Sequence, residues 1–130
     1  MSVDTFDPGA LQAPLDQAAV TELCRAAARF VGETPDLSEL EARRFAPLVT
    51  HPDWAAAAEQ LDNETLVQLI RLLTVGEGLY TGWQAGDKSA VIVLVRVLKA
   101  RDAFDGELSR WIKAHTDNKF LPHGSLMDRL

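Results

Sequence analysis

The chain has 130 residues and a formal net charge of −6, with 47% hydrophobic and 25% charged residues. These values are typical of one folded domain and exclude a disordered or fibrous chain. No apolar run approaches the roughly 20 residues that span a bilayer, and the first residues are acidic where a secretory signal would be basic and then apolar. We therefore expect a cytoplasmic protein with no membrane partner.

Charge is unevenly distributed along the sequence. Residues 1–65 contain four arginines, no lysine and twelve acidic residues, a net charge of −8, whereas residues 66–130 contain nine basic and seven acidic residues, a net charge of +2. Nucleic-acid binders usually concentrate basic charge, and the sequence pI is near 4.9, so we expect no nucleic-acid partner. We expect this asymmetry to belong to a solvated surface without a partner, and the alternatives are head-to-tail self-association or an anionic partner on the second half.

A loose N-terminal arm and one helix open the chain. Residues 1–14 contain two prolines and show no periodicity, which predicts an arm followed by a single helical domain over residues 15–130. Apolar residues at helical spacing predict a helix over residues 15–31 that ends at Gly32. Cys24, the single cysteine, excludes an internal disulfide, and its Ala-rich surroundings favour a buried structural thiol over a reactive one.

Two short helices should follow. A second helix is predicted to start at residues 35–38, with Leu37 and Leu40 facing inward. We expect Pro47 to end it, because proline lacks the amide donor and disfavours helix in the residue before it. A third helix is predicted over residues 52–58, with proline in its first turn.

The most apolar stretches, residues 66–75 and 90–98, are separated by a linker over residues 76–86 that contains four glycines. The first stretch follows the helical i, i+3, i+4, i+7 rule, and Asp62 is its expected N-cap. Its wide apolar surface predicts contacts on more than one side. The second stretch is rich in β-branched residues and could form a buried strand. We predict a helix, because no second run resembles it as a pairing partner.

The segment over residues 82–89 resembles a phosphate-binding loop, but its spacing differs from that motif. Three residues separate its glycines, and Asp87 stands between Gly86 and Lys88. We therefore expect the glycines to turn the chain and Asp87 or Ser89 to cap the next helix. A weaker anion site at that helix start, using Lys88, is the alternative.

The C-terminal region should form one more helix and a docked segment. A sixth helix is predicted to begin at residues 105–107, and its apolar face contains Leu108, Trp111, Ile112 and His115. Residues 118–130 are too apolar for a free tail and are expected to dock on the domain as an irregular segment.

No residue set carries a catalytic or metal signature. His115, Asp117 and His123 could in principle ligate a metal, but their spacing matches no known pattern. The candidate nucleophiles have no paired base at a recognisable spacing: Cys24, Ser89, Ser109 and Ser125. We expect no cofactor, and we expect binding rather than catalysis.

A candidate binding surface is suggested by large amphipathic side chains and arginines, the usual anchors of interfaces. Its members are Tyr80, Trp83, Arg96, Arg110, Trp111, His115, Phe120 and His123. For each tryptophan, packing in the core is the competing interpretation.

Together these patterns predict an all-α fold, a single compact domain of about six helices in stacked hairpins with a docked C-terminal segment. The predicted function is a small adaptor or regulatory module that binds an apolar segment of a protein partner or self-associates as a homodimer. Trp83 and residues 120–130 would line or close its groove. The alternatives are a small-ligand-binding protein or minor enzyme with a pocket near Trp111, His115 and His123, and a structural part that builds filaments. An open apolar patch would favour the interaction module, whereas a closed cavity with polar groups would favour the small-ligand-binding protein.

Overall fold

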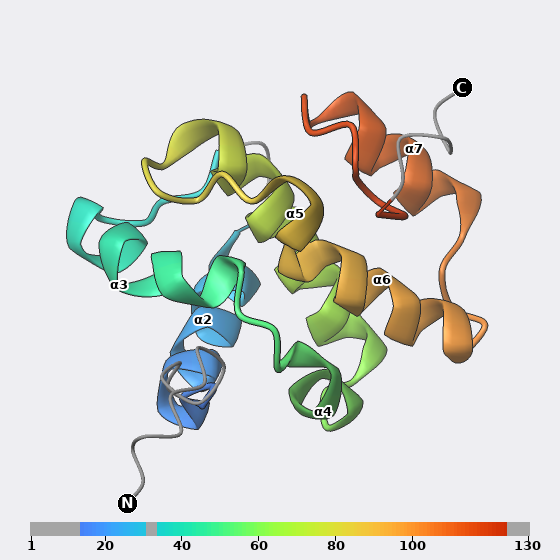
Figure 1. Cartoon of the computed structure of the whole chain (residues 1–130), viewed down its shortest axis with the longest axis horizontal. Helices are drawn as coiled ribbons and strands as arrows, with labels where there is room; N and C mark the ends of the chain where they lie inside the picture. The colour runs from blue at the N-terminus through green and yellow to red at the C-terminus, as the bar shows by residue number, and fades with distance from the viewer. Residues whose placement is uncertain (1–13, 31–33, 125–130) are drawn as a thin grey trace, which may run out of the picture.

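The computed structural model describes residues 14–30 and 34–124. Within these ranges the chain forms six α-helices and one 3₁₀ turn, with no strand, so the all-α prediction is confirmed (Figure 1). The helices are α2 (Gln17–Arg29), α3 (Glu39–Val49), α4 (Trp54–Glu59), α5 (Asn63–Leu79), α6 (Ala90–Ala100) and α7 (Gly106–Ala114), and the 3₁₀ turn is η2 (Gly86–Lys88). Nearly all of the predicted arm over residues 1–14 lies outside the described residues.

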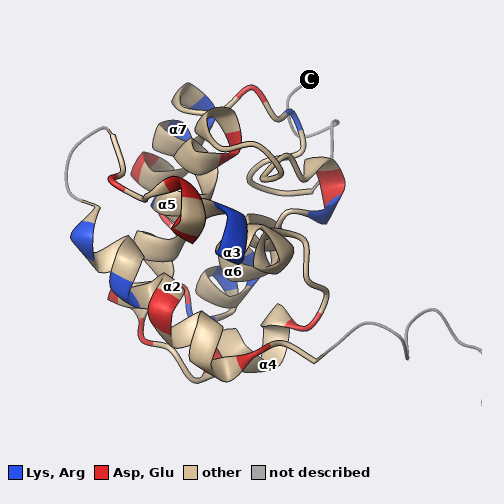
Figure 2. Ribbon diagram, turned by 90° about the vertical axis from the view of Figure 1, so that its left-hand side faces the viewer, with Lys and Arg blue, Asp and Glu red and all other residues tan. Residues whose placement is uncertain are grey.

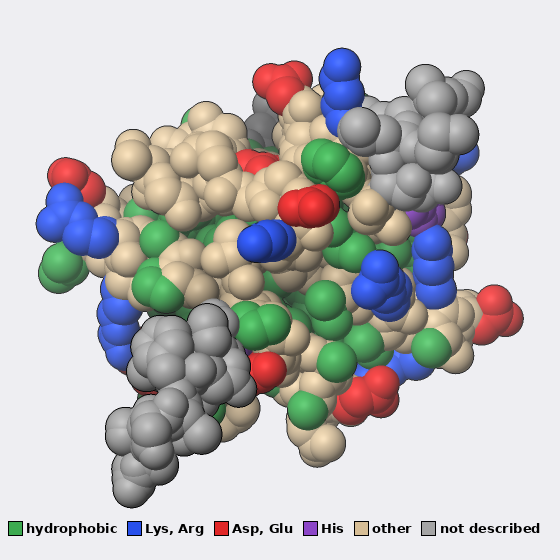
Figure 3. All heavy atoms as spheres, in the orientation of Figure 1, with side chains coloured by type: hydrophobic (Ala, Val, Ile, Leu, Met, Phe, Trp, Pro, Cys, Tyr) green, Lys and Arg blue, Asp and Glu red, His purple; other side chains and the backbone are tan. Residues whose placement is uncertain are grey.

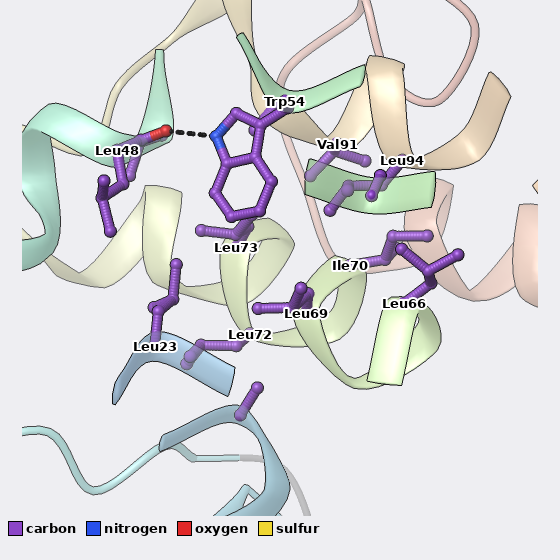
Figure 4. Close-up of a cluster of buried hydrophobic side chains, with 14 of the residues drawn as sticks. Leu23, Leu48, Trp54, Leu66, Leu69, Ile70, Leu72, Leu73, Val91 and Leu94 are labelled. Carbon is purple, nitrogen blue, oxygen red and sulfur yellow. Dashed lines mark hydrogen bonds between the residues drawn. The ribbon is translucent and has the colours of Figure 1, made fainter. Parts of the chain in front are cut away.

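Helix α5 occupies the centre of the fold. It packs against α2 on one side and α6 on the other, while α4 covers α6 and α3 contacts α2 (Figures 1 and 2). In Figure 4, Leu72 lies beside Leu23 of α2, whereas Leu66 and Ile70 lie near Leu94 of α6. All five side chains are buried, and each stabilises the fold by about 1.5–3 kcal/mol. The predicted contacts on more than one side of this helix are confirmed.

The β-branched run over residues 90–98 is helical, as predicted. It forms α6, whose N-cap Ser89 accepts a hydrogen bond through Oγ from the amide of Val91 at 3.2 Å. Most of its side chains are buried against α4 and α5, so tertiary burial outweighs the strand preference of valine and isoleucine. The predicted N-cap of α5 is also present, because Asp62 accepts a 2.8 Å hydrogen bond from the amide of Thr65.

Two expectations for α3 are wrong. The helix continues through Pro47 to Val49, because Pro47 lies on its exposed face near the end, where the unpaired carbonyl oxygen of Arg43 can meet water. Leu40, expected to face inward, is 74% exposed. The buried face of α3 instead runs through Ala42, Phe45, Leu48 and Val49, and the helical period turns position 40 away from it.

Trp83 belongs to the core, so its expected place on the binding surface is corrected. Its side chain has no exposed area, and its indole Nε1 donates a 2.7 Å hydrogen bond to the carbonyl oxygen of Ala42 in α3. Trp54 is also fully buried and donates in the same way to the carbonyl oxygen of Leu48 at 2.7 Å (Figure 4). The two indoles anchor the linker and α4 to α3.

The segment after α7 docks on the domain, as predicted, as far as it is described. Leu121 is 1% exposed and joins the hydrophobic core, and Pro122 is buried. The remaining part of the expected docked segment, residues 125–130, lies outside the described residues.

Cys24 is partly buried and packs against the core rather than being fully enclosed. Burial, with a smaller contribution from the charge of Asp62, raises the pKa of its thiol above the usual value. The thiol is therefore protonated near neutral pH, which is the behaviour of a structural cysteine. Separately, none of the helices in residues 14–30 and 34–124 is both long and apolar enough to cross a membrane.

Candidate functional site

A hollow on the described part of the molecule lies between the end of α5, the glycine-rich linker and the segment that follows α7. We call it the linker cleft, and its volume is about 830 Å³. Its polar and aromatic lining residues are Glu77, Gln84, His115, Thr116, Asp117, Asn118, Lys119 and Phe120. This volume lies within the range of sites that bind small molecules or short peptide segments.

The carboxylate of Glu77 joins the walls of the linker cleft. It accepts a hydrogen bond from the amide of Ala85 at 3.0 Å and from Nδ2 of Asn118 at 3.0 and 3.3 Å. Asn118 also donates through Nδ2 to the carbonyl oxygen of Gly86 at 3.0 Å. One carboxylate and one amide therefore connect α5, the linker and the C-terminal segment. Bonds to a charged acceptor are stronger than neutral ones, so this connection fixes the cleft in shape.

The side chain of Gln84 forms hydrogen bonds with the backbone of the linker. Its Nε2 donates to the carbonyl oxygens of Glu77 at 2.7 Å and Tyr80 at 3.2 Å, and its Oε1 accepts from the amide of Gly82 at 3.2 Å. Gly82 has φ +91°, a conformation that side-chain-bearing residues rarely adopt. The turn predicted from the glycines is therefore present, and Gln84 stabilises it by satisfying backbone groups.

Asn118 also shapes its own segment. Its side-chain Oδ1 accepts a hydrogen bond from the backbone N–H of Phe120 at 2.9 Å. Its own backbone N–H donates to Oγ1 of Thr116 at 3.0 Å. These local bonds replace the helical ladder that ends with α7. They also place the half-buried ring of Phe120 on the wall of the cleft.

An aromatic stack borders the cleft. The ring of His115 stacks on Trp111 with centroids 4.2 Å apart and an angle of 17° between the planes, and the guanidinium of Arg71 lies 5.5 Å from the centre of the Trp111 ring. Nδ1 of His115 lies 2.7 Å from the carbonyl oxygen of Trp111. Because a carbonyl oxygen only accepts, this nitrogen carries a proton, so in the neutral ring Nε2 is the acceptor that a bound molecule could meet.

The sequence-derived candidates do not form one surface. His115 and Phe120 line the linker cleft, and the ring of Trp111 stacks against that of His115. Tyr80 is half-buried against Trp83, with ring centroids 4.9 Å apart, and its hydroxyl lies 3.5 Å from the carbonyl oxygen of Pro35. Burial raises the pKa of the Tyr80 phenol above its usual value.

The other three candidates lie elsewhere. Arg96 lies on the outer face of α6, and Arg110 is exposed on α7. Nδ1 of His123 lies 2.6 Å from Nζ of Lys99, and its ring meets Phe104 edge to face. The pocket expected near Trp111, His115 and His123 therefore contains only His115 among these three residues.

The described residues contain no group of three or more His, Cys, Asp or Glu side chains that could hold a metal ion. His115 and His123 each have another partner, the carbonyl oxygen of Trp111 and the ammonium of Lys99. The linker cleft does contain carboxylates and a lysine, which can form hydrogen bonds and ion pairs with a polar ligand.

Sequence reasoning missed Glu77, Gln84 and Asn118, the residues that build the cleft. Glu77 and Asn118 are 41 positions apart, and each has an ordinary polar side chain in an unremarkable local sequence. No periodicity or spacing connects them, so only the packing of the helices reveals their contact.

Comparison with protein-family models, with curated proteins and with solved structures gives no match to this chain. Function must therefore be argued from the chemistry of the site.

Proposed function

We propose that this protein is a small helical interaction module and that the linker cleft receives a segment of a partner protein. The observation that carries the proposal is the cleft of about 830 Å³ with walls fixed by the Glu77–Asn118 hydrogen bonds. A site that is already in its binding shape loses little conformational entropy when it binds. The proposed setting is the cytoplasm, with no nucleic-acid partner.

The lining supports recognition of a peptide that carries both polar and apolar groups. His115 and Phe120 offer ring surfaces, and Asp117 and Lys119 offer charges of both signs. Aromatic side chains are frequent anchors of protein interfaces. Leu79 follows the cleft residue Gly78 directly and is 55% exposed, which supports additional apolar contact outside the cleft.

A small polar ligand is the second candidate occupant, because the volume of the cleft suits one and its lining is rich in hydrogen-bonding groups. This alternative requires that a compound of that size fills the cleft without contact at Leu79. Self-association through the same surface is a variant of the interaction function.

Site-specific photo-crosslinking in the cells that produce the protein tests the proposal. A photoreactive phenylalanine analogue replaces Lys119, at the cleft, or Lys113, an exposed lysine on α7 that does not line it. We expect a discrete crosslinked protein from position 119 that is absent from position 113. Identical products at both positions, or none at position 119, would contradict a partner in this cleft.

Two further measurements separate the other possibilities. A crosslinked product with twice the mass of the chain, together with a dimer in light scattering, would identify self-association. A metabolite that raises the melting temperature, with no crosslinked protein, would favour the small-ligand alternative. The Asn118→Ala variant, which removes the bonds to Glu77, should weaken binding in each case.

A further inference from the structure

A second concave surface lies on the outer side of α6, and it shares no lining residue with the linker cleft. We call it the α6 groove. Its volume is about 560 Å³, and its walls include Lys88 and Arg96 on one side and His51 and Pro52, from the turn before α4, on the other. Nδ1 of His51 accepts a 3.1 Å hydrogen bond from the amide of Asp53, which fixes that turn.

Two cations on this groove have no charged partner among residues 14–30 and 34–124. Lys88 and Arg96 are exposed, and neither forms a salt bridge or a side-chain hydrogen bond within the part of the chain that the structure describes. By contrast, Arg29 is paired with Asp36 and Glu41. Among the described residues that line the groove, Asp87 is the one acidic side chain, and it forms a salt bridge with neither cation.

The surface between the two cations is apolar. Ile92 and Val93 of α6 line the groove, with Pro52 opposite them. Val93 is partly exposed there, and Ile92 is nearly buried. Figure 3 views this side of the molecule and shows blue Lys and Arg side chains around green hydrophobic ones over α6. The groove thus combines apolar side chains with the positive charges of Lys88 and Arg96.

The spacing of the cations favours an extended chain. Lys88 directly precedes the N-cap of α6 and Arg96 is the seventh residue of the helix, so they are eight positions apart, about 12 Å along the axis at about 1.5 Å per residue. An extended peptide covers about 13–14 Å in four residues, at about 3.3–3.6 Å each, and its side chains alternate between two faces. Two carboxylates four positions apart would therefore lie on the same face and reach both cations.

We propose that the α6 groove binds an acidic segment of a partner protein, with two carboxylates four residues apart and an apolar side chain midway between them. The carboxylates pair with Lys88 and Arg96, and the apolar side chain lies on Val93 and Pro52. Charge complementarity carries this assignment, because Lys88 and Arg96 outnumber the single carboxylate of Asp87 on the groove, although the protein as a whole has a net charge of −6. The proposal is independent of the occupant of the linker cleft.

A synthetic peptide tests this directly. The probe is acetyl-Gly-Asp-Ala-Leu-Ala-Asp-Gly-amide, and its control has asparagine at both acidic positions. Titrated into the full-length ¹⁵N-labelled protein at low salt, the acidic peptide should shift amide signals between Lys88 and Arg96. We expect the control peptide to bind at least about tenfold more weakly, and added salt to weaken the acidic peptide.

Charge reversal adds a matched control. The double variant Lys88→Glu/Arg96→Glu should weaken binding at least about tenfold, whereas Arg25→Glu/Lys113→Glu makes the same charge change at exposed residues outside the groove and should change binding less than about twofold. A peptide with lysine in place of both aspartates should bind the double variant better than the parent. This rescue also shows that the variant is folded.

Several outcomes would overturn the proposal. Equal binding of the acidic and amide peptides would show that charge is not recognised, and an unchanged affinity in the double variant would place the peptide elsewhere. Inorganic phosphate that produces the same shifts and displaces the peptide would assign the groove to small anions. Salt-dependent dimerisation that the double variant abolishes would assign it to a second copy of this chain.

Discussion

At the scale of single residues, the fold depends on how closely α5 approaches the linker. A Cβ atom added to Gly76 would lie 2.5 Å from ring carbons of Trp83, a distance that forces a displacement. Trp83 cannot retreat easily, because its ring is fully buried and its indole is hydrogen-bonded to Ala42. Gly78, one half-turn further along the same helix, has no neighbouring atom within 4 Å of the same added group.

These two glycines give a matched pair of substitutions. We expect Gly76→Ala to lower the free energy of unfolding by about 1–3 kcal/mol through overpacking. Gly78→Ala should raise it by about 0.5–1 kcal/mol, because alanine is the better helix former. Urea denaturation of both variants measures the difference. An increase in both would show that Trp83 can move away at little cost.

At the scale of helices, Arg101, the C-cap of α6, connects that helix to the end of α4 and the start of α5, which lie about 40 positions earlier in the sequence. Its guanidinium donates to the carbonyl oxygens of Ala58, Glu59 and Leu61 and to Oδ1 of Asn63, at 2.8–3.3 Å. It thereby gives carbonyl groups at the end of α4 a charged donor, in addition to the 3.0 Å bond that Ala58 accepts from the amide of Leu61, and holds them against the end of α6.

Removing this side chain tests its role. Arg101→Met retains much of the aliphatic stem, so the expected loss of about 1–3 kcal/mol in the free energy of unfolding reports on the hydrogen bonds. Arg101→Lys should recover only part of it, because an ammonium cannot reproduce the planar arrangement of donors. Thermal denaturation compares both with Arg25→Met, an exposed residue of α2. Equal losses for Arg101→Met and Arg25→Met would contradict this role.

The N-cap of α3 predicts a dependence on pH. The backbone hydrogen bond from Ser38 and then the guanidinium of Arg29 hold the pKa of Glu41 below its usual 4.5. A carboxyl with a lowered pKa in the folded state stabilises the protein above pH 4.5, and this contribution is lost as the pH falls through the lower folded value. We expect the free energy of unfolding to fall less steeply between pH 5 and about pH 3 in Glu41→Gln than in the parent. Parallel profiles would contradict this assignment.

The helices were predictable where one physical signal dominated. Asp62 and Ser89 cap the helices that the sequence assigns to them, and the apolar period of residues 66–75 indicates the central helix. The predictions that Pro47 ends α3 and that Leu40 faces inward were wrong. A proline near an exposed helix end is tolerated, and a single leucine does not define a buried face. Trp83 was ambiguous, since an indole suits both a core and an interface. The Glu77–Asn118 contact depends on tertiary packing alone.

At the scale of the whole molecule, the linker cleft connects the C-terminal segment with the central helix. Through Glu77 and Asn118, residues 41 positions apart hold the linker between them. The docked segment is therefore attached at two points, by this polar contact and by Leu121 in the core. Loss of the polar contact should open the cleft while the remaining helices stay folded.

Asn118→Asp tests this attachment with almost no change in shape. A second carboxylate about 3 Å from that of Glu77 should lower stability near pH 7 by about 1–3 kcal/mol, because the amide donor is replaced by a like charge. The pair would hold a proton with a raised pKa, so the penalty should shrink as the pH falls towards 4. Urea denaturation at pH 7 and pH 4 measures both effects. A penalty that does not vary with pH would exclude charge repulsion.

The stacked rings of Trp111 and His115 give the molecule a built-in optical reporter. The other two indoles are sealed from solvent, whereas Trp111 is half-buried and touches an imidazole beside the linker cleft. Its emission should therefore respond to aqueous quenchers such as iodide and to a molecule that binds against the His115 ring in the linker cleft. The fluorescence of the buried Trp54 and Trp83 should change only on global unfolding. Tryptophan emission can therefore follow ligand binding in the linker cleft separately from denaturation.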